Sequence, residues 1–233
     1  MECFSAYAAH ELRGEITLQV ALAEIALADP DADTAALRRM GEDVVASCKR
    51  QERLLEALLT LARGEYGQLR REPIDLAATS ADVLRAQGPH PPRRVTTLAP
   101  AVTVGNPELV KRLLTNLVDN AIRHNIPDGR LDLATHTTAS RAVLTIANTG
   151  PVIPTGEVDR LFRPFQRLRS HPGAEPDGTG LGLAIVQAIA DGHNATIHAT
   201  ARSGGGLRID ISFPSLSPDH ERRALDLSRA PPR

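Results

Sequence analysis

The chain has no long apolar run, little net charge and few cysteines, and each of these shortages excludes a class of protein. The best apolar stretch is interrupted by Gln19 and Glu24 before it reaches membrane-spanning length, and no signal-peptide pattern follows Met1. A formal net charge of −1 over 233 residues provides no general attraction to nucleic acid. We therefore expect a segment that makes no membrane contact of its own and has no nucleic-acid partner.

Cysteine and aromatic residues are equally scarce. Cys3 and Cys48 lie in expected helices without the spacing of a metal site, and two unpaired cysteines suit a reducing cytosol. Only four phenylalanines occur, and two of them, Phe162 and Phe165, precede a polar loop over 167–177. The pair is either part of the core or the anchor of a lid that closes over a ligand.

Three glycines at alternate positions, Gly178, Gly180 and Gly182, lead directly into a helix with apolar periodicity. Glycine tolerates the φ values that a tight loop requires, and the start of the helix presents unpaired N–H groups and the positive end of its dipole to an anion. The segment is typical of a loop that wraps the phosphates of a nucleotide. A glycine-rich helix entry that binds no ligand is the alternative.

Two asparagines lie four residues apart on an expected helix, so that both amides cover one face. The helix begins with Asn106 and Pro107, which supply a cap and a first-turn residue, and it carries Asn116 and Asn120. Because Mg²⁺ binds few protein oxygens besides substrate phosphates, one asparagine carbonyl suits a metal-triphosphate site. A cap or a buried amide that bonds a neighbouring loop is the alternative.

Asn148 and Gly150 follow an apolar run over 142–146 that predicts a buried strand. A side-chain acceptor at the end of that strand can meet the exocyclic amine of a base, and a glycine allows the base to approach the backbone. An ordinary Asn-Gly-Pro turn is the alternative.

His10 lies early on a long helical pattern near the N-terminus, and Glu11 follows it. A neutral imidazole is a competent nucleophile toward a phosphoryl group, and the adjacent carboxylate can accept its proton or orient the ring. A surface histidine without a function is the alternative.

Taken in order, these segments resemble the catalytic core of the sensor histidine kinases of two-component systems, and the likeness spans residues 4–213. They stand in the places of the family's His box, asparagine box, first glycine box, phenylalanine box and second glycine box. The resemblance implies ATP and Mg²⁺ as cofactors. It assigns His10 as the phosphoacceptor, Glu11 as its acid/base partner, Asn120 as the magnesium ligand, Asn116, Arg123 and His124 as residues facing the nucleotide, Asn148 and Gly150 as readers of adenine, and Gly178, Thr179, Gly180, Leu181 and Gly182 as the phosphate loop.

The sequence departs from the family pattern at four positions. Asn148 replaces the usual aspartate and Val152 a usual glycine, and loss of the charged acceptor is expected to weaken adenine binding by about 1 to 3 kcal/mol. Gly14 replaces the Thr or Asn associated with dephosphorylating the partner, and Glu15 replaces a helix-kinking proline. We expect a straighter helix and an altered balance between kinase and phosphatase activity.

The expected fold class is α+β, in two domains. Residues 1–65 form a helical hairpin for dimerisation and histidine phosphotransfer, and 66–73 form a linker. Residues 74–214 form an ATP-binding domain, which by the resemblance is an α/β sandwich of Bergerat type, and 215–233 form a disordered tail. Since two helices cannot bury both apolar faces alone, the hairpin is expected to pair with a second chain into a four-helix bundle.

The helices and strands are expected from periodicity and turn residues. Helices are expected near 4–28, 34–64 and 76–87, and strands near 94–98, 101–105, 130–137, 141–147, 195–202 and 207–213.

The leading functional hypothesis is an ATP-dependent autokinase that phosphorylates His10 and relays the phosphoryl group to an aspartate in the receiver domain of a response regulator. Two alternatives remain open: an ATP-binding dimeric scaffold with little turnover, and a Bergerat-fold ATPase or serine kinase. We expect a homodimeric cytoplasmic segment, and family members commonly carry a membrane sensor ahead of the His box. Because His10 lies so near the start, the chain is expected to be a piece of a longer membrane-anchored protein.

Overall fold

The computed structural model describes residues 16–17, 19–21, 23–28, 33–62, 71–87, 93–138, 140–166 and 180–215. The chain divides into two compact units, Met1–Ala62 and Arg63–Arg233. The predicted phosphoacceptor His10, its neighbour Glu11, the altered positions Gly14 and Glu15, and the phosphate-loop residues Gly178 and Thr179 lie outside the described residues, as does the tail beyond Ser215.

The first unit contains two helical segments. Residues 16–17, 19–21 and 23–28 are helical, and α2 (Thr34–Ala62) follows. The Asp33 carboxylate accepts the N–H of Ala36 at 2.6 Å and so caps α2. Gln19 Nε2 donates to Cys48 Sγ at 3.4 Å, which places the two segments side by side. The predicted helix over 34–64 is confirmed within the described residues.

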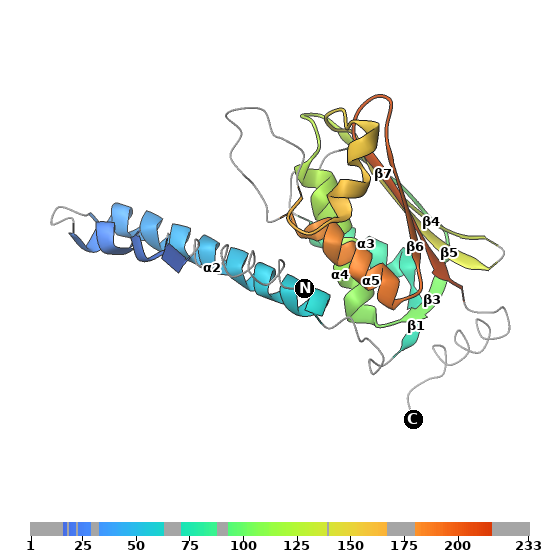
Figure 1. The fold of residues 1–233 in the computed structure, drawn as a ribbon, viewed down its shortest axis with the longest axis horizontal. Coiled ribbons are helices and arrows are strands. Elements are labelled where there is room, and N and C mark those ends of the chain that lie inside the picture. The colour runs from blue at the N-terminus through green and yellow to red at the C-terminus, as the bar shows by residue number, and fades with distance from the viewer. Residues whose placement is uncertain are drawn as a thin grey trace. The chain divides into compact units, whose positions relative to one another are not determined.

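The second unit is a two-layer α/β structure (Figure 1). Its five-stranded sheet has the order β2-β4-β5-β7-β6, in which β2 and β4 are parallel and the other neighbours antiparallel. The strands are β2 (Arg93–Leu98), β4 (Arg130–Thr138), β5 (Arg141–Asn148), β6 (Thr196–Ala201) and β7 (Leu207–Pro214). The helices α3 (Leu76–Ala86), α4 (Pro107–Arg123) and α5 (Gly182–Gly192) cover one face.

The core lies between this sheet and the helices. Alternate strand residues point inward, so the register places Leu133 beside Ile146 and Ile146 beside Ile209, and all three are buried. From the helix side, Leu113 and Leu117 of α4 are also buried. Buried apolar residues recur at every second position in the strands and at every third or fourth position in α4. The two patterns therefore supply the two sides of one core.

The predicted strands are confirmed to within one residue at each end. The structure adds one strand that the pattern does not predict, β1 (Glu72–Asp75), which pairs antiparallel with β3 (Val102–Gly105) in a separate two-stranded sheet. Pro73 argues against a strand in the sequence, but a two-stranded ribbon leaves one edge of β1 without a hydrogen-bonding neighbour, where proline is tolerated. Two short 3₁₀ helices, η2 (Thr155–Glu157) and η3 (Asp159–Phe162), were also not expected.

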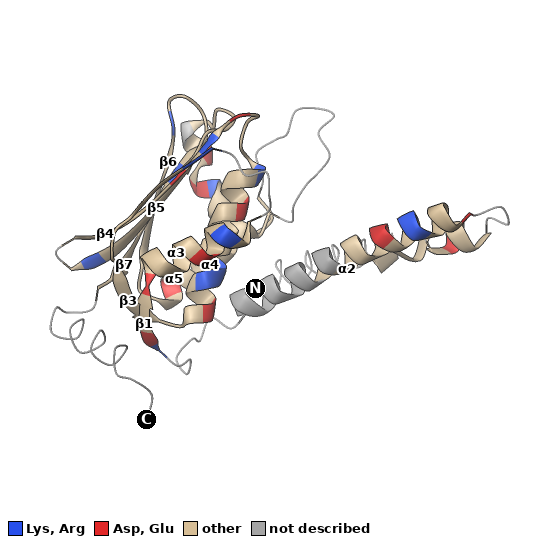
Figure 2. Ribbon diagram, turned by 180° about the vertical axis from the view of Figure 1, so that it is seen from behind, with Lys and Arg blue, Asp and Glu red and all other residues tan. Residues whose placement is uncertain are grey.

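Acidic and basic residues are interspersed over the coloured part of α2 and over the described residues of the second unit (Figure 2). This distribution agrees with the small net charge of the sequence. Among the described residues, no helix is both long enough and apolar enough to cross a membrane.

Candidate functional site

The asparagine-bearing helix α4 is fixed at its start by two contacts. Asn106 caps it, because its side-chain oxygen accepts the Leu109 N–H at 3.0 Å, and Pro107 occupies the first turn, as predicted. The backbone N–H of Asn106 donates to Nε2 of the buried His193, at the end of α5, at 3.0 Å. The start of α4 is therefore tied to the end of α5.

The predicted ligand residues Asn116 and Asn120 are half-buried on α4. Asn116 Nδ2 donates to the Arg112 carbonyl at 2.9 Å, which holds the amide against its own helix. Asn116 Oδ1 lies close to Gly182 at the start of α5: a Cβ added to that glycine would be 3.6 Å from this oxygen. Within the described part of the chain, the Asn120 amide makes no hydrogen bond, so its carbonyl oxygen is available as a ligand.

Asn148 ends β5 and is 4% exposed. Its Nδ2 donates to the carbonyl oxygen of Thr149 at 2.7 Å and to that of His124, just past the end of α4, at 3.2 Å. A carbonyl can only accept, so these two contacts fix which side of the amide is nitrogen. Asn148 Oδ1 accepts no hydrogen bond from the described residues and is available to a ligand amine.

Two of the residues where the sequence departs from the family pattern, Asn148 and Val152, fit their surroundings. An aspartate at position 148 in this conformation would place an oxygen against two carbonyl oxygens, whereas the amide of Asn148 donates to both. Val152 is 75% exposed, so its branched side chain displaces nothing in the fold. Gly150 packs against protein: a Cβ there would lie 2.6 Å from the His124 carbonyl oxygen.

The start of α5 is a candidate anion site. Leu181 precedes the helix and makes no side-chain cap, so the first N–H groups, beginning at Gly182, have no side-chain acceptor at the cap position. Gly180 adopts φ +67°, a conformation that disfavours other residues, and its carbonyl accepts the N–H of Phe165 at 3.0 Å. This hydrogen bond joins the described segments that lie on either side of the predicted lid over 167–177.

The structure brings part of the predicted site together in one unit. The second half of α4, the end of β5 and the start of α5 contribute Asn116, Asn120, Asn148 and Gly182. Arg123 and His124 lie exposed at the last turn of α4. No group of three acidic, histidine or cysteine side chains suited to a metal occurs among the described residues. A site that relies on one amide oxygen and substrate phosphates needs no such group.

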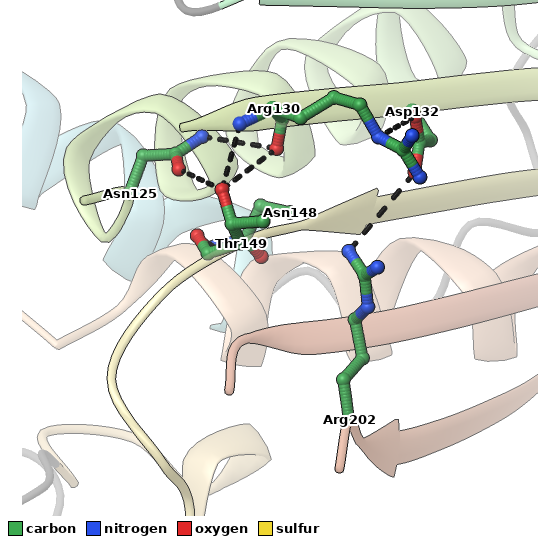
Figure 3. Close-up of polar contacts among 6 residues, drawn as sticks. All are labelled: Asn125, Arg130, Asp132, Asn148, Thr149 and Arg202. Carbon is green, nitrogen blue, oxygen red and sulfur yellow. Dashed lines mark hydrogen bonds and ion pairs between the residues drawn. The ribbon is translucent and has the colours of Figure 1, made fainter. Parts of the chain in front are cut away.

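Two residues that the sequence patterns do not single out join these elements (Figure 3). The Thr149 hydroxyl donates to Asn125 Oδ1 at 2.5 Å and accepts the backbone N–H of Arg130 at 2.7 Å. Asn125 follows α4 and Thr149 follows β5. Their positions directly after His124 and Asn148 are a signal in the sequence, but their contact requires the fold.

Comparison with known proteins identifies the family. Residues 105–217 match the family described as "Histidine kinase-, DNA gyrase B-, and HSP90-like ATPase". The chain is 39% identical to Sensor protein CutS of Streptomyces coelicolor, over 91% of this chain and 52% of that protein. It is 31% identical to the "Probable sensor histidine kinase TcrY" of Mycobacterium tuberculosis, over 86% of this chain and 43% of that protein. The chain thus spans about half the length of these relatives.

Solved structures agree with this result. The Acinetobacter baumannii histidine kinase AdeS superimposes with a TM-score of 0.70 and 26% identity, covering 89% of this chain and 98% of that one. The mycobacterial sensor histidine kinase MprB superimposes with a TM-score of 0.54 and 26% identity, covering 63% of this chain and 98% of that one. The predicted fold, with its α/β sandwich of Bergerat type, and the predicted family are both confirmed. The chain belongs to the sensor histidine kinases of two-component systems.

Proposed function

We propose that this chain is an ATP-dependent autokinase that phosphorylates His10 and passes the phosphoryl group to an aspartate in a response-regulator receiver domain. The observation that carries the proposal is the fixed amide of Asn148. Its nitrogen donates to two carbonyls, so its oxygen is the atom that remains as a hydrogen-bond acceptor. Adenine offers a donor at its 6-amino group, which matches this acceptor.

The other residues of the site have complementary tasks in the proposal. The uncapped start of α5, with the loop Gly178, Thr179, Gly180, Leu181 and Gly182, holds the phosphates through backbone N–H groups. Asn116, Arg123 and His124 line the nucleotide, and Asn120 Oδ1 would ligate Mg²⁺. The bound ion would neutralise charge on the phosphates.

His10 supplies the nucleophile. A bond forms between an imidazole nitrogen and the γ-phosphorus while the bond to the bridging oxygen of ADP breaks, and Glu11 accepts the proton that the ring loses. Because phosphoryl transfer depends mostly on positioning, the linker between the two units must allow the nucleotide to reach His10.

Homodimerisation through the helical hairpin completes the proposal. Large apolar side chains are exposed on both helical segments of the first unit, including Ile25 at 69%, Leu27 at 82% and Val45 at 52%. A second copy of the hairpin would cover such faces in a four-helix bundle.

The test is incubation of the chain with γ-³²P-labelled ATP and Mg²⁺. We expect protein-bound label that is labile to acid and stable to base, as a phosphoramidate is, and that disappears in His10→Gln. His136→Gln is the matched control, because His136 is an exposed histidine on β4, away from the residues assigned to the site. Transfer of the label to an aspartate of an added receiver domain would complete the pathway.

Two results would refute the autokinase. ATP binding without labelled protein would favour the dimeric scaffold. Label on a serine of a separate protein, with none on this chain, would favour a serine kinase.

A further inference from the structure

The contact between Asn125 and Thr149 has a consequence for nucleotide choice. We infer that these two residues are positioning residues that lock the amide of Asn148 in the orientation that selects a 6-amino purine over a 6-oxo purine. The inference rests on the proposed nucleotide site and names two residues that determine its specificity.

An asparagine at position 148 has two possible orientations. With Oδ1 toward the base it accepts from a 6-amino group, and with Nδ2 toward the base it donates to a 6-oxo group. An aspartate presents two equivalent oxygens and has no such ambiguity. A chain that carries Asn148 therefore needs a structural device to select one orientation.

Both acceptors that select the orientation belong to segments that the Asn125–Thr149 contact joins. One is the carbonyl of Thr149 itself, 2.7 Å from Asn148 Nδ2, and the other is the carbonyl of His124, the residue before Asn125, at 3.2 Å. The Thr149 hydroxyl donates to Asn125 Oδ1 at 2.5 Å. This hydrogen bond keeps the end of β5 beside the end of α4, so both carbonyls stay on the same side of the Asn148 amide.

Arg130, at the start of β4, bonds to both Asn125 and Thr149 and so holds their contact in place (Figure 3). The backbone N–H of Arg130 donates to the Thr149 hydroxyl at 2.7 Å, and the Arg130 carbonyl accepts from the Thr149 N–H at 2.9 Å and from Asn125 Nδ2 at 3.2 Å. The Arg130 side chain pairs with Asp132 at 2.8 Å. The Thr149 hydroxyl has one proton, which is closest to Asn125 Oδ1 and has the Arg130 carbonyl as a longer second acceptor at 3.3 Å, and it accepts the Arg130 N–H. Removal of the hydroxyl therefore breaks its contacts to both segments.

The test compares the dissociation constants of the full chain for ATP and for inosine triphosphate, which has a 6-oxo group in place of the 6-amino group. Thr149→Val keeps the side-chain shape and removes the hydroxyl. We expect the preference for ATP to fall by about three- to tenfold, the effect of roughly one hydrogen bond, because ATP binds more weakly and inosine triphosphate more tightly. Asn125→Ala removes the other partner and should change the same ratio.

Two substitutions serve as controls. Thr149→Ser retains the hydroxyl and should retain the ratio. Thr135→Val removes a buried hydroxyl on β4 that donates to the Ala99 carbonyl at 2.7 Å, and it should lower stability without changing the ratio. A purely structural effect would weaken both nucleotides equally, so the ratio separates positioning from folding.

The outcomes separate this inference from the proposed function. If the unaltered chain prefers ATP and Asn148→Ala abolishes the preference, but Thr149→Val and Asn125→Ala leave it unchanged, the positioning role is refuted and the adenine site stands. If the unaltered chain binds neither nucleotide, or Asn148→Ala leaves the preference intact, the proposed adenine site itself is wrong.

Discussion

Acidification should destabilise the second unit through His193, a buried histidine at the end of α5. The His193 ring is 4% exposed and lies edge-on to Phe213, with ring centroids 6.3 Å apart. Its Nδ1 donates to the Ile189 carbonyl at 2.7 Å, so its Nε2 is the acceptor for the Asn106 N–H at 3.0 Å. A proton on Nε2 would place two donors face to face at the start of α4.

The direction of the pH dependence follows from the pKa of this ring. Burial lowers the pKa of His193 below its ordinary value of 6.5; the Ile189 carbonyl partly opposes this, and the positive charge of Arg71 adds to the lowering. Between the folded pKa and 6.5, His193 is therefore protonated in the unfolded chain and neutral in the folded chain. The contribution of His193 to stability is complete above pH 6.5 and is lost as the pH falls from there through the folded pKa.

Because a single proton is bound, the change in the free energy of unfolding with pH has an upper limit. The free energy of unfolding should fall by at most about 1.4 kcal/mol for each pH unit in this window. Urea unfolding of the full chain between pH 7.5 and 5.5, followed by circular dichroism for the transition that melts the sheet, measures the slope. His193→Gln cannot titrate and should remove it, whereas His136→Gln, at an exposed position, should not.

An unchanged slope in His193→Gln would refute this reasoning. The titration of Asp210 lies outside this pH window. Burial opposes the ionisation of Asp210, but hydrogen bonds from Arg208 and Thr145 hold its pKa below the ordinary value of 3.8, so it protonates only at more acidic pH.

Three further predictions concern the turn over 203–206 between β6 and β7, the proposed metal ligand and the proposed dimer. Gly206→Ala should destabilise the fold by more than about 1 kcal/mol and weaken ATP binding, because Gly206 has φ +93° and a Cβ would overlap the Asn148 carbonyl oxygen; Gly204→Ala, where a Cβ meets open space, should change neither the melting temperature nor the dissociation constant. Asn120→Ala should abolish the gain in ATP affinity that Mg²⁺ provides in calorimetry, and a retained gain would exclude Asn120 as ligand. Val45→Asp places a charge on an exposed apolar position and should raise the dissociation constant of the dimer in sedimentation equilibrium; an unchanged constant would exclude Val45 from the interface.

The sequence by itself determined the family and the elements other than β1 and the two 3₁₀ helices. Capping at Asn106 and alternation along β7 depend on residues a few positions apart, so these features can be predicted without a fold. The order of the glycine, asparagine and histidine segments indicated the family for the same reason, because each segment carries its chemistry locally.

Only the tertiary structure decided how distant residues orient one another. Position 148 indicates a polar acceptor in the sequence, but the orientation of its amide depends on the carbonyl of His124, 24 residues away in the chain. The neutral acceptor state of His193 likewise depends on the N–H of Asn106, 87 residues away. A buried amide or imidazole offers both a donor and an acceptor, and the partners that choose between them are supplied by packing, which no local pattern encodes.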